Sequence, residues 1–126
     1  MTVQETGNIF SKIGGINAVH EIVDLFYDKV LADPRVNFFF KDADMNVQRG
    51  KMKAFLMMAL GGPVKFTGKD MRLAHTHLVR GGLRDSHFDA VAVHLVAALR
   101  ECGVDDSVCS QIATMAERVR AEVLNK

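Results

Sequence analysis

Glycine and proline residues divide this chain of 126 residues into segments of helical length. A periodic stretch begins at Gly14-Gly15 and must end before Pro34, because the residue preceding a proline is pushed out of the helical region. Further breaks fall at Gly61-Gly62-Pro63, Gly81-Gly82 and Gly103. Between these breaks, apolar residues recur at intervals of three and four, as on the buried face of an amphipathic helix. The pattern predicts an all-α protein, and the sequence shows no convincing strand alternation.

Local signals suggest where each helix begins. Asp42 or Asp44 can cap a helix that runs to about Leu60, and Asp105 or Asp106 can start the last helix. Ser86 followed by Asp89 resembles a capping box. Residues 64–70 have no clear period and are predicted to form a loop. The expected inner stripes are Val19, Val23, Phe26, Tyr27 and Val30; Met71, His75 and Leu78; Phe88, Val91, Leu95, Ala98 and Cys102; and Val108, Ile112, Met115, Val119 and Val123.

Length and composition restrict the class of protein. A chain of this length fits one domain, spanning residues 1–126, with one core. Charged residues make up 25% and the net charge is +1, so neither nucleic acid nor a membrane is the expected partner, and the spread of charge favours a monomer. The start MTVQETGNIF carries no export signal, which makes the cytoplasm the expected location. Cys102 and Cys109 are therefore expected as thiols, with a disulfide as the alternative.

Five histidines raise the question of a metal site. His20, His87 and His94 fall on helices or near helix ends, at positions that fit solvent exposure, and each is expected to be a surface or half-buried residue. His75 and His77 are two positions apart, roughly 200° of rotation on a helix, so they cannot both face one site. His75 is a lone histidine on an apolar stripe. Such a histidine can be a core residue or a metal ligand, and the spacing does not decide between the two. No zinc-type spacing of cysteine and histidine is present.

The second predicted helix places polar groups on its inner face. Gln48, Met52, Phe55 and Ala59 stand at i, i+4, i+7 and i+11. Tyr27 lies on the inner stripe of the first helix. A buried amide and a buried hydroxyl both need hydrogen-bond partners. Either a polar object lies inside the pocket, or these side chains bond one another, or the helix is turned enough to expose Gln48 to water.

Three segments resemble the truncated haemoglobins of the first group, which are short two-over-two globins. They are FYDKVLADPRVNFFFKDADM, KAFLMMALGGPVKFTGKDMRLAH and SHFDAVAVHLVAALRECGV. The resemblance extends from about Ile9 to Val123 and includes the glycine pairs Gly14-Gly15 and Gly61-Gly62. It implies a two-over-two helical sandwich around a haem.

The resemblance also implies roles for single residues. His75 matches the proximal histidine that binds haem iron, and Tyr27 matches the distal tyrosine that donates a hydrogen bond to bound dioxygen. Phe40 matches the aromatic residue that packs against the haem, with Phe39 beside it. Distal or haem-contact positions, for ligand binding, gating or apolar packing, are implied for Gln48, Phe55, Met71, Leu83 and Val91.

Two departures from the family pattern affect these expectations. Met52 stands where many relatives have a second amide, so the distal network is expected to be reduced to Tyr27 and Gln48. The last helix reads ATMAERVRAEV and lacks the histidine that some relatives use to attach haem covalently. The expected cofactor is therefore haem b, held by His75 and by packing.

Lys51 is open to two interpretations. At the haem edge it would pair with a propionate, worth about 1 kcal/mol or less if exposed. Alternatively, it is a sixth iron ligand, as similar positions are in some relatives. Ligation needs the neutral amine, and loss of the proton at pH 7 costs an ordinary lysine about 4–5 kcal/mol before any bond forms. Met52 is a conceivable thioether ligand, although packing is its simpler role.

Three functions follow from these patterns. The first is a haem protein that binds dioxygen, nitric oxide and carbon monoxide, and converts nitric oxide to nitrate with the help of an unidentified reductase. The second is a six-coordinate haem protein for electron transfer or redox sensing, with Lys51 as the distal ligand. The third is a helical interaction module without a cofactor.

Overall fold

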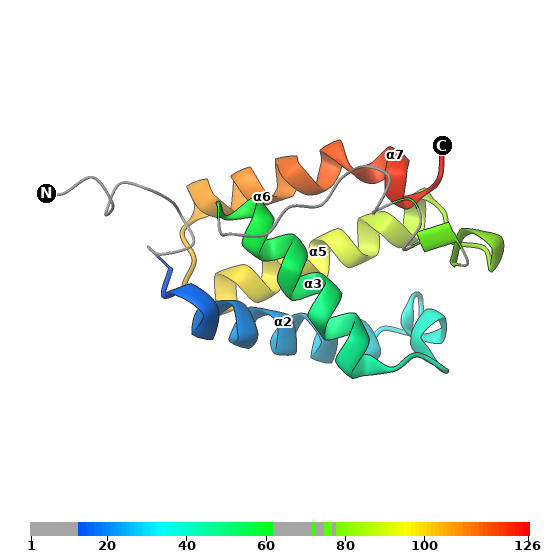
Figure 1. Cartoon of the computed structure of the whole chain (residues 1–126), viewed down its shortest axis with the longest axis horizontal. Helices are drawn as coiled ribbons and strands as arrows, with labels where there is room; N and C mark the ends of the chain where they lie inside the picture. The colour runs from blue at the N-terminus through cyan, green and yellow to red at the C-terminus, as the bar shows by residue number, and fades with distance from the viewer. Residues whose placement is uncertain (1–12, 62–71, 73–74, 77) are drawn as a thin grey trace, which may run out of the picture.

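The computed structural model describes residues 13–61, 72, 75–76 and 78–126, and its elements are helical (Figure 1). They are α2 (Gly15–Leu31), the short 3-10 helix η2 (Asn37–Phe40), α3 (Met45–Ala59), α5 (Asp85–Glu101), α6 (Asp106–Arg118) and α7 (Arg120–Val123). Residues 72, 75, 76 and 78–80 are also helical, and within the described ranges no strand occurs. The predicted loop over 64–70 lies outside these ranges. The expectation of an all-α fold is confirmed.

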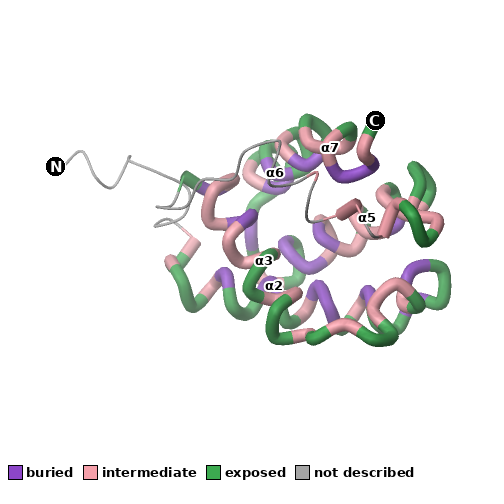
Figure 2. Tube along the Cα trace, turned by 45° about the vertical axis from the view of Figure 1, so that its right-hand side comes forward, coloured by how far each residue is buried: buried purple, intermediate pink, exposed green. Residues whose placement is uncertain are grey.

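The helices pack as two layers around one apolar core. Helix α2 contacts both α3 and α5, and α5 contacts α6. The buried segments of these helices face one another, while their exposed segments face outward (Figure 2). Burial of such facing apolar stripes is the main source of stability for short helices. The fully buried side chains include Val19, Ile22, Phe26, Val30, Leu56, Leu60, Leu99 and Ile112.

Several predicted helix boundaries are confirmed. Asp44 caps α3, with its Oδ1 accepting from the Asn46 amide at 2.9 Å. Asp105 caps α6, with its Oδ1 accepting from the Val108 amide at 3.0 Å. Each carboxylate satisfies an amide that has no partner within the helix. Gly103 has a φ of 85°, a left-handed conformation that ends a helix at little cost in glycine.

The predicted start of α5 was wrong. The helix begins at Asp85 with Arg84 as its N-cap, so Ser86 lies inside the first turn and forms no capping box with Asp89. Instead, the Arg84 amide donates to Nδ1 of His87 at 3.1 Å. The imidazole of His87 therefore accepts the hydrogen bond from the N-cap amide that a glutamate side chain accepts in a capping box.

The last helix also differs from the prediction. It breaks at Val119, whose ψ of 3° separates α6 from α7. Ile112 and Val123 are buried as predicted, but Cys109 and Ala116 are buried in place of Val108 and Met115, which are half-buried. Because Ile112 belongs to both sets, the inner face of α6 is turned by less than one residue from the expected stripe. Cys102 and Cys109 are free cysteines, as expected.

A buried carboxylate, that of Asp33, connects the turn after α2 to helix α5 by a hydrogen bond. Asp33 is 9% exposed, and its Oδ2 lies 2.7 Å from His94 Nε2 and 2.8 Å from Arg35 Nη2. The hydrogen bonds from Arg35, and then the one from His94, hold the pKa of the Asp33 carboxyl well below its usual range. The side chain of His94 is 18% exposed, which agrees with the half-buried alternative expected for this residue.

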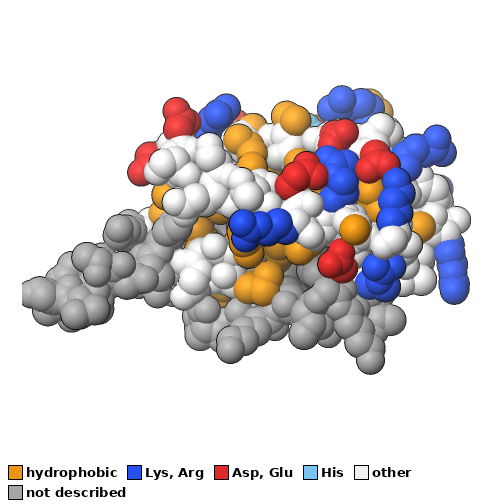
Figure 3. All heavy atoms as spheres, turned by 90° about the horizontal axis from the view of Figure 1, so that it is seen from above, with side chains coloured by type: hydrophobic (Ala, Val, Ile, Leu, Met, Phe, Trp, Pro, Cys, Tyr) orange, Lys and Arg blue, Asp and Glu red, His pale blue; other side chains and the backbone are white. Residues whose placement is uncertain are grey.

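The surface carries charges of both signs. On the face seen from above in Figure 3, Lys and Arg side chains lie among Asp and Glu side chains. One such cluster is centred on Arg120, which pairs with Asp85, Asp89 and Glu117. In the part of the chain that the structure describes, no helix is both long and apolar enough to cross a membrane.

Candidate functional site

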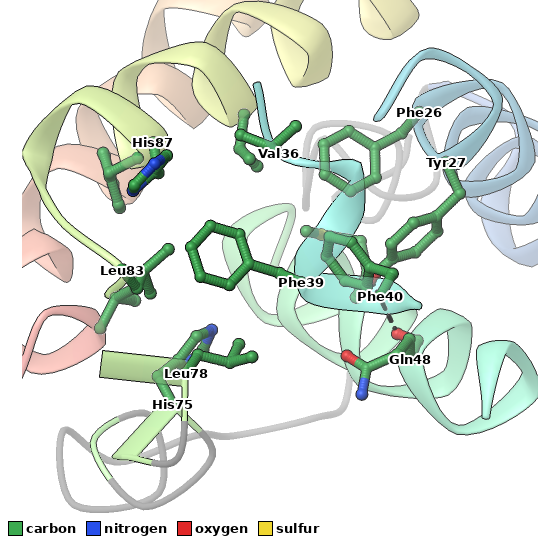
Figure 4. Close-up of a pocket in the computed structure, with 14 residues that line it drawn as sticks. Phe26, Tyr27, Val36, Phe39, Phe40, Gln48, His75, Leu78, Leu83 and His87 are labelled. Atoms are coloured by element: carbon green, nitrogen blue, oxygen red, sulfur yellow. Dashed lines mark hydrogen bonds between the residues drawn. The ribbon is translucent and has the colours of Figure 1, made fainter. Parts of the chain in front are cut away.

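A largely apolar cavity of about 110 Å³ lies between α2, η2, α3, the helical turn that bears His75, and the start of α5 (Figure 4). Of the ten predicted site residues, seven line it: Tyr27, Phe40, Gln48, Met52, His75, Leu83 and Val91. The other described side chains in its wall are Phe26, Val36, Phe39, Leu78, His87, Phe88 and Val123. The structure therefore brings most of the predicted site together.

Tyr27 reaches the cavity from α2 with a buried hydroxyl group. The residue is 4% exposed, and its hydroxyl donates to the backbone oxygen of Gln48 at 3.1 Å. Its ring packs edge-on against Phe26 and Phe40, with centroids 4.8 and 5.8 Å away. Burial raises the pKa of Tyr27 strongly, and the nearby Arg49 guanidinium opposes this only in part. The phenol therefore keeps its hydrogen and remains a donor at neutral pH.

Gln48 contributes to the wall in a different way from the one predicted. Its side chain is half-buried and lines the cavity. The atom that contacts Tyr27 is nevertheless the backbone carbonyl, while the side-chain amide points away from the tyrosine ring (Figure 4). The sequence left three alternatives for Gln48 and Tyr27, and the structure agrees best with a hydrogen bond between the two residues. The acceptor of this bond is a main-chain atom of Gln48 rather than its side chain.

His75 lies on the opposite side of the cavity from Tyr27 and Gln48. It stands beside Leu78, and the ring of Phe39 lies between these two walls (Figure 4). The short helical turn that carries His75 is tied to the C-terminal residues. Thr76 Oγ1 donates to Asn125 Oδ1 at 2.9 Å, and Asn125 Nδ2 donates to the Arg72 carbonyl at 3.1 Å. His77 and Met71 lie outside the described residues.

His87 lines the cavity, although the sequence predicted only a surface or half-buried residue there, with no part in the site. It is half-buried, and its ring stands edge-on to Phe39 at 4.9 Å between centroids. Because Nδ1 accepts from the Arg84 amide, Nε2 carries the hydrogen in the neutral ring. A signal was present in the sequence: His87 precedes Val91 by four residues and so shares its helix face.

Two predicted residues stand outside the cavity wall. Phe55 is 6% exposed and packs in the apolar core beside α2. Lys51 is exposed on α3, next to Met52, which does line the cavity.

The side chains that line the cavity are of the chemical types that bind a haem. His75 on one wall would offer an imidazole nitrogen to the haem iron, and the apolar and aromatic side chains would suit a flat apolar ring. Tyr27 would offer a hydrogen-bond donor from the opposite wall. Cofactor pockets usually measure about 300–1,000 Å³. The lining side chains, Phe39 above all, must therefore turn aside to admit the group.

Comparison with known proteins agrees with this fold and site. The chain matches the bacterial-like globin family over residues 8–125. It is 48% identical over 118 residues to a group 1 truncated hemoglobin of Chlamydomonas moewusii, covering 94% of this chain and 68% of that one. It is 45% identical over 118 residues to the group 1 truncated hemoglobin of Tetrahymena pyriformis, covering 94% and 95% of the two chains.

A solved structure gives the same result. The 2/2 hemoglobin of Synechococcus sp. PCC 7002, in the cyanomet state and with covalently attached heme, matches with a TM-score of 0.87 and 43% identity. The match covers 94% of this chain and 99% of that chain. An all-α fold with a histidine and a tyrosine on opposite walls of one apolar cavity agrees with a globin. This chain belongs to the bacterial-like globin family, as a group 1 truncated haemoglobin with the two-over-two fold. The family implies a haem cofactor and the binding of diatomic gases such as dioxygen.

Proposed function

We propose that this protein holds haem b without a covalent link, through His75, and binds dioxygen on the side of the haem that faces Tyr27. The observation that carries the proposal is the position of His75 and the Tyr27 hydroxyl on opposite walls of one apolar cavity. When bound, haem supplies the iron that takes up a diatomic ligand. The segment from Asp105 to Lys126 contains no histidine, which supports non-covalent retention.

The lining residues have separate tasks. The imidazole of His75 would hold the iron, and Phe40 and Val91 would pack against the ring. The Tyr27 hydroxyl would offer a hydrogen bond to a polar diatomic ligand, worth about 1–3 kcal/mol in a dry pocket. The Nε2 hydrogen of His87 is a donor suited to a haem carboxylate, because this ring lies beside the exposed Phe38 at the edge of the cavity.

The proposed reaction is conversion of nitric oxide to nitrate. One nitric oxide, one dioxygen and one electron give one nitrate ion, and a reductase supplies the electron. The protein needs no acid or base for this step, because its contribution is to retain dioxygen and to admit a second diatomic molecule. Rapid mixing of the oxygenated protein with nitric oxide tests the proposal. We expect nitrate at a rate far above that of free haem, and a rate no faster than free haem would refute it.

Binding of haem is tested separately by titration. Wild-type protein is expected to give a Soret band at one haem per chain, and His75→Ala to lose tight binding. His20→Ala is the matched control, because His20 is exposed on α2 and is expected to leave the titration unchanged. Equal binding by His75→Ala and wild type would exclude His75 as the principal ligand.

Six-coordination by Lys51 stays a prediction of its own. The exposed position of this side chain agrees with the propionate role, whereas ligation requires it to turn inward past Met52. Ferric Lys51→Ala protein distinguishes the two. An unchanged spectrum excludes Lys51 as the ligand, and a change from six-coordinate low spin to high spin identifies it. Lys53→Ala, two residues further along the same helix, is the control.

A further inference from the structure

The outward face of α5 carries a short apolar strip, which we call the α5 strip. Val93 is 63% exposed, the highest value among the large apolar side chains that the structure describes. The side chains around it form a shallow groove. The opposite face of α5 is the buried one, with Leu95, Ala98 and Leu99 in the core. The α5 strip consists of Asp89, Ala92, Val93, Val96, Ala97 and Arg100.

The order of residues in the α5 strip has two-fold symmetry. Read from either end, it runs charged, small, valine, valine, small, charged, with the same spacings. The two charges, Asp89 and Arg100, are three turns or roughly 16 Å apart along the helix. In a two-fold contact, residue i of one copy meets residue j of the other, and j meets i. An antiparallel pair of α5 helices therefore sets Val93 against Val96, and Asp89 against Arg100, at both ends.

The charges select this arrangement over the alternatives. The side chains of Asp89 and Arg100 are each 62% exposed, although Arg120 and Asp106 contact them within the chain. Both therefore retain surface for a second partner. A parallel pair would bring Asp89 against Asp89 and Arg100 against Arg100, which repel. Between the charges, Ala92 and Ala97 allow the two helix backbones to approach closely, and positions 89, 93, 96 and 100 have the spacing of a helix-pair seam.

We propose that the α5 strip is the interface of a homodimer in which two copies of the chain pack α5 against α5, antiparallel, about a two-fold axis. The occupant is a second copy because the strip is complementary to itself in residue order and in charge. This inference departs from the monomer expected from the spread of charge along the sequence. The strip is short, so the interface belongs to the small, transient class, with a dissociation constant of roughly 10 µM to 1 mM.

Sedimentation equilibrium of the purified protein, from about 20 µM to about 2 mM, measures the association. We expect the mean mass to rise with concentration from the monomer value of 13.9 kDa toward twice that value. Val93→Asp is expected to abolish the rise. Val47→Asp is the matched control, because Val47 is 49% exposed on α3, away from the strip. A mass that stays at the monomer value, or equal weakening by the two variants, overturns the proposal.

Charge reversal tests the antiparallel order directly. Asp89→Arg alone places two arginines at each end, and Arg100→Asp alone places two aspartates there, so each variant is expected to associate at least tenfold more weakly than wild type. An equimolar mixture of the two restores an opposite pair at both ends, and association is expected to return. Such recovery cannot come from a damaged fold. A mixture no more associated than its components refutes the antiparallel pairing.

Discussion

At the scale of single residues, the Tyr27 side chain is the group that we expect to discriminate between ligands. Its ring is held by Phe26 and Phe40, and its hydroxyl points toward the cavity wall formed by Gln48. Burial raises the pKa of the Tyr27 phenol, so the group keeps its hydrogen and is a hydrogen-bond donor at neutral pH. A polar diatomic ligand gains more from such a donor than an apolar one does.

Tyr27→Phe removes this donor and keeps the ring. We expect dioxygen to dissociate about 5 to 150 times faster, which corresponds to a loss of about 1–3 kcal/mol. Carbon monoxide is less polar, so its dissociation rate is expected to change by a smaller factor. Flash photolysis and stopped-flow mixing measure both rates. Equal changes for the two gases would show that the substitution altered access to the cavity rather than hydrogen bonding.

At the scale of elements, the turn that carries His75 is held by residues near the C-terminus. Asn125 adopts a left-handed φ of 58° and bonds both to the carbonyl of Arg72 and to the hydroxyl of Thr76. These two residues stand three positions before and one position after His75. The hydrogen bonds therefore fix the height and tilt of the turn from which the imidazole projects.

Asn125→Gly removes these bonds while tolerating the left-handed backbone. We expect the loss of haem to excess apomyoglobin to become several-fold faster, and the free energy of unfolding to fall by about 1–2 kcal/mol. Resonance Raman spectra of the ferrous protein should show a shifted iron–histidine stretch. Asn46→Gly on α3 controls for a general loss of stability, and equal effects of both on haem loss and on the stretch would contradict a positioning role for Asn125.

Sequence signals predicted those elements whose ends are determined locally. Asp44, Asp105 and Gly103 act within a turn of their own position, so their roles are legible in the sequence. The break at Val119 has no glycine or proline to mark it in the sequence. His87 was expected to be a surface or half-buried residue without a role in the site, although its spacing from Val91 indicated the cavity. The pair Asp33–His94 joins residues 61 positions apart, and no local pattern predicts such a contact.

At the scale of the whole molecule, the Asp33 carboxylate makes the free energy of unfolding depend on pH, because its ionised form connects the turn after α2 to α5. Its folded-state pKa lies below the unfolded value of about 3.9, so its contribution to stability is complete above that pH and is lost as the pH falls through and below it. The contribution comes from Arg35 and His94, and the latter lies on the partner helix α5.

Asp33→Asn is therefore expected to lower the midpoint of thermal unfolding at pH 6–7, and to differ less from wild type at about pH 3. Unfolding followed by circular dichroism at a series of pH values gives the comparison. The exposed Asp28→Asn on α2 is the control, expected to leave the midpoint nearly unchanged. A difference from wild type that stays constant from pH 7 to pH 3 would show that the ionised carboxylate is not what matters.

The hydrogen bond from Tyr27 to the Gln48 carbonyl joins two different helices, α2 and α3. The Tyr27 hydroxyl has one hydrogen, so it can donate to a gas molecule only if it no longer donates to the Gln48 carbonyl. Ligand binding would therefore break one hydrogen bond between α2 and α3. Bound ligands ordinarily protect a protein from local opening. Here the start of α3 would open more readily with the ligand in place, and its amide hydrogens would exchange faster with solvent while those elsewhere slow down. Binding of the gas molecule would thus make the start of α3 less rigid.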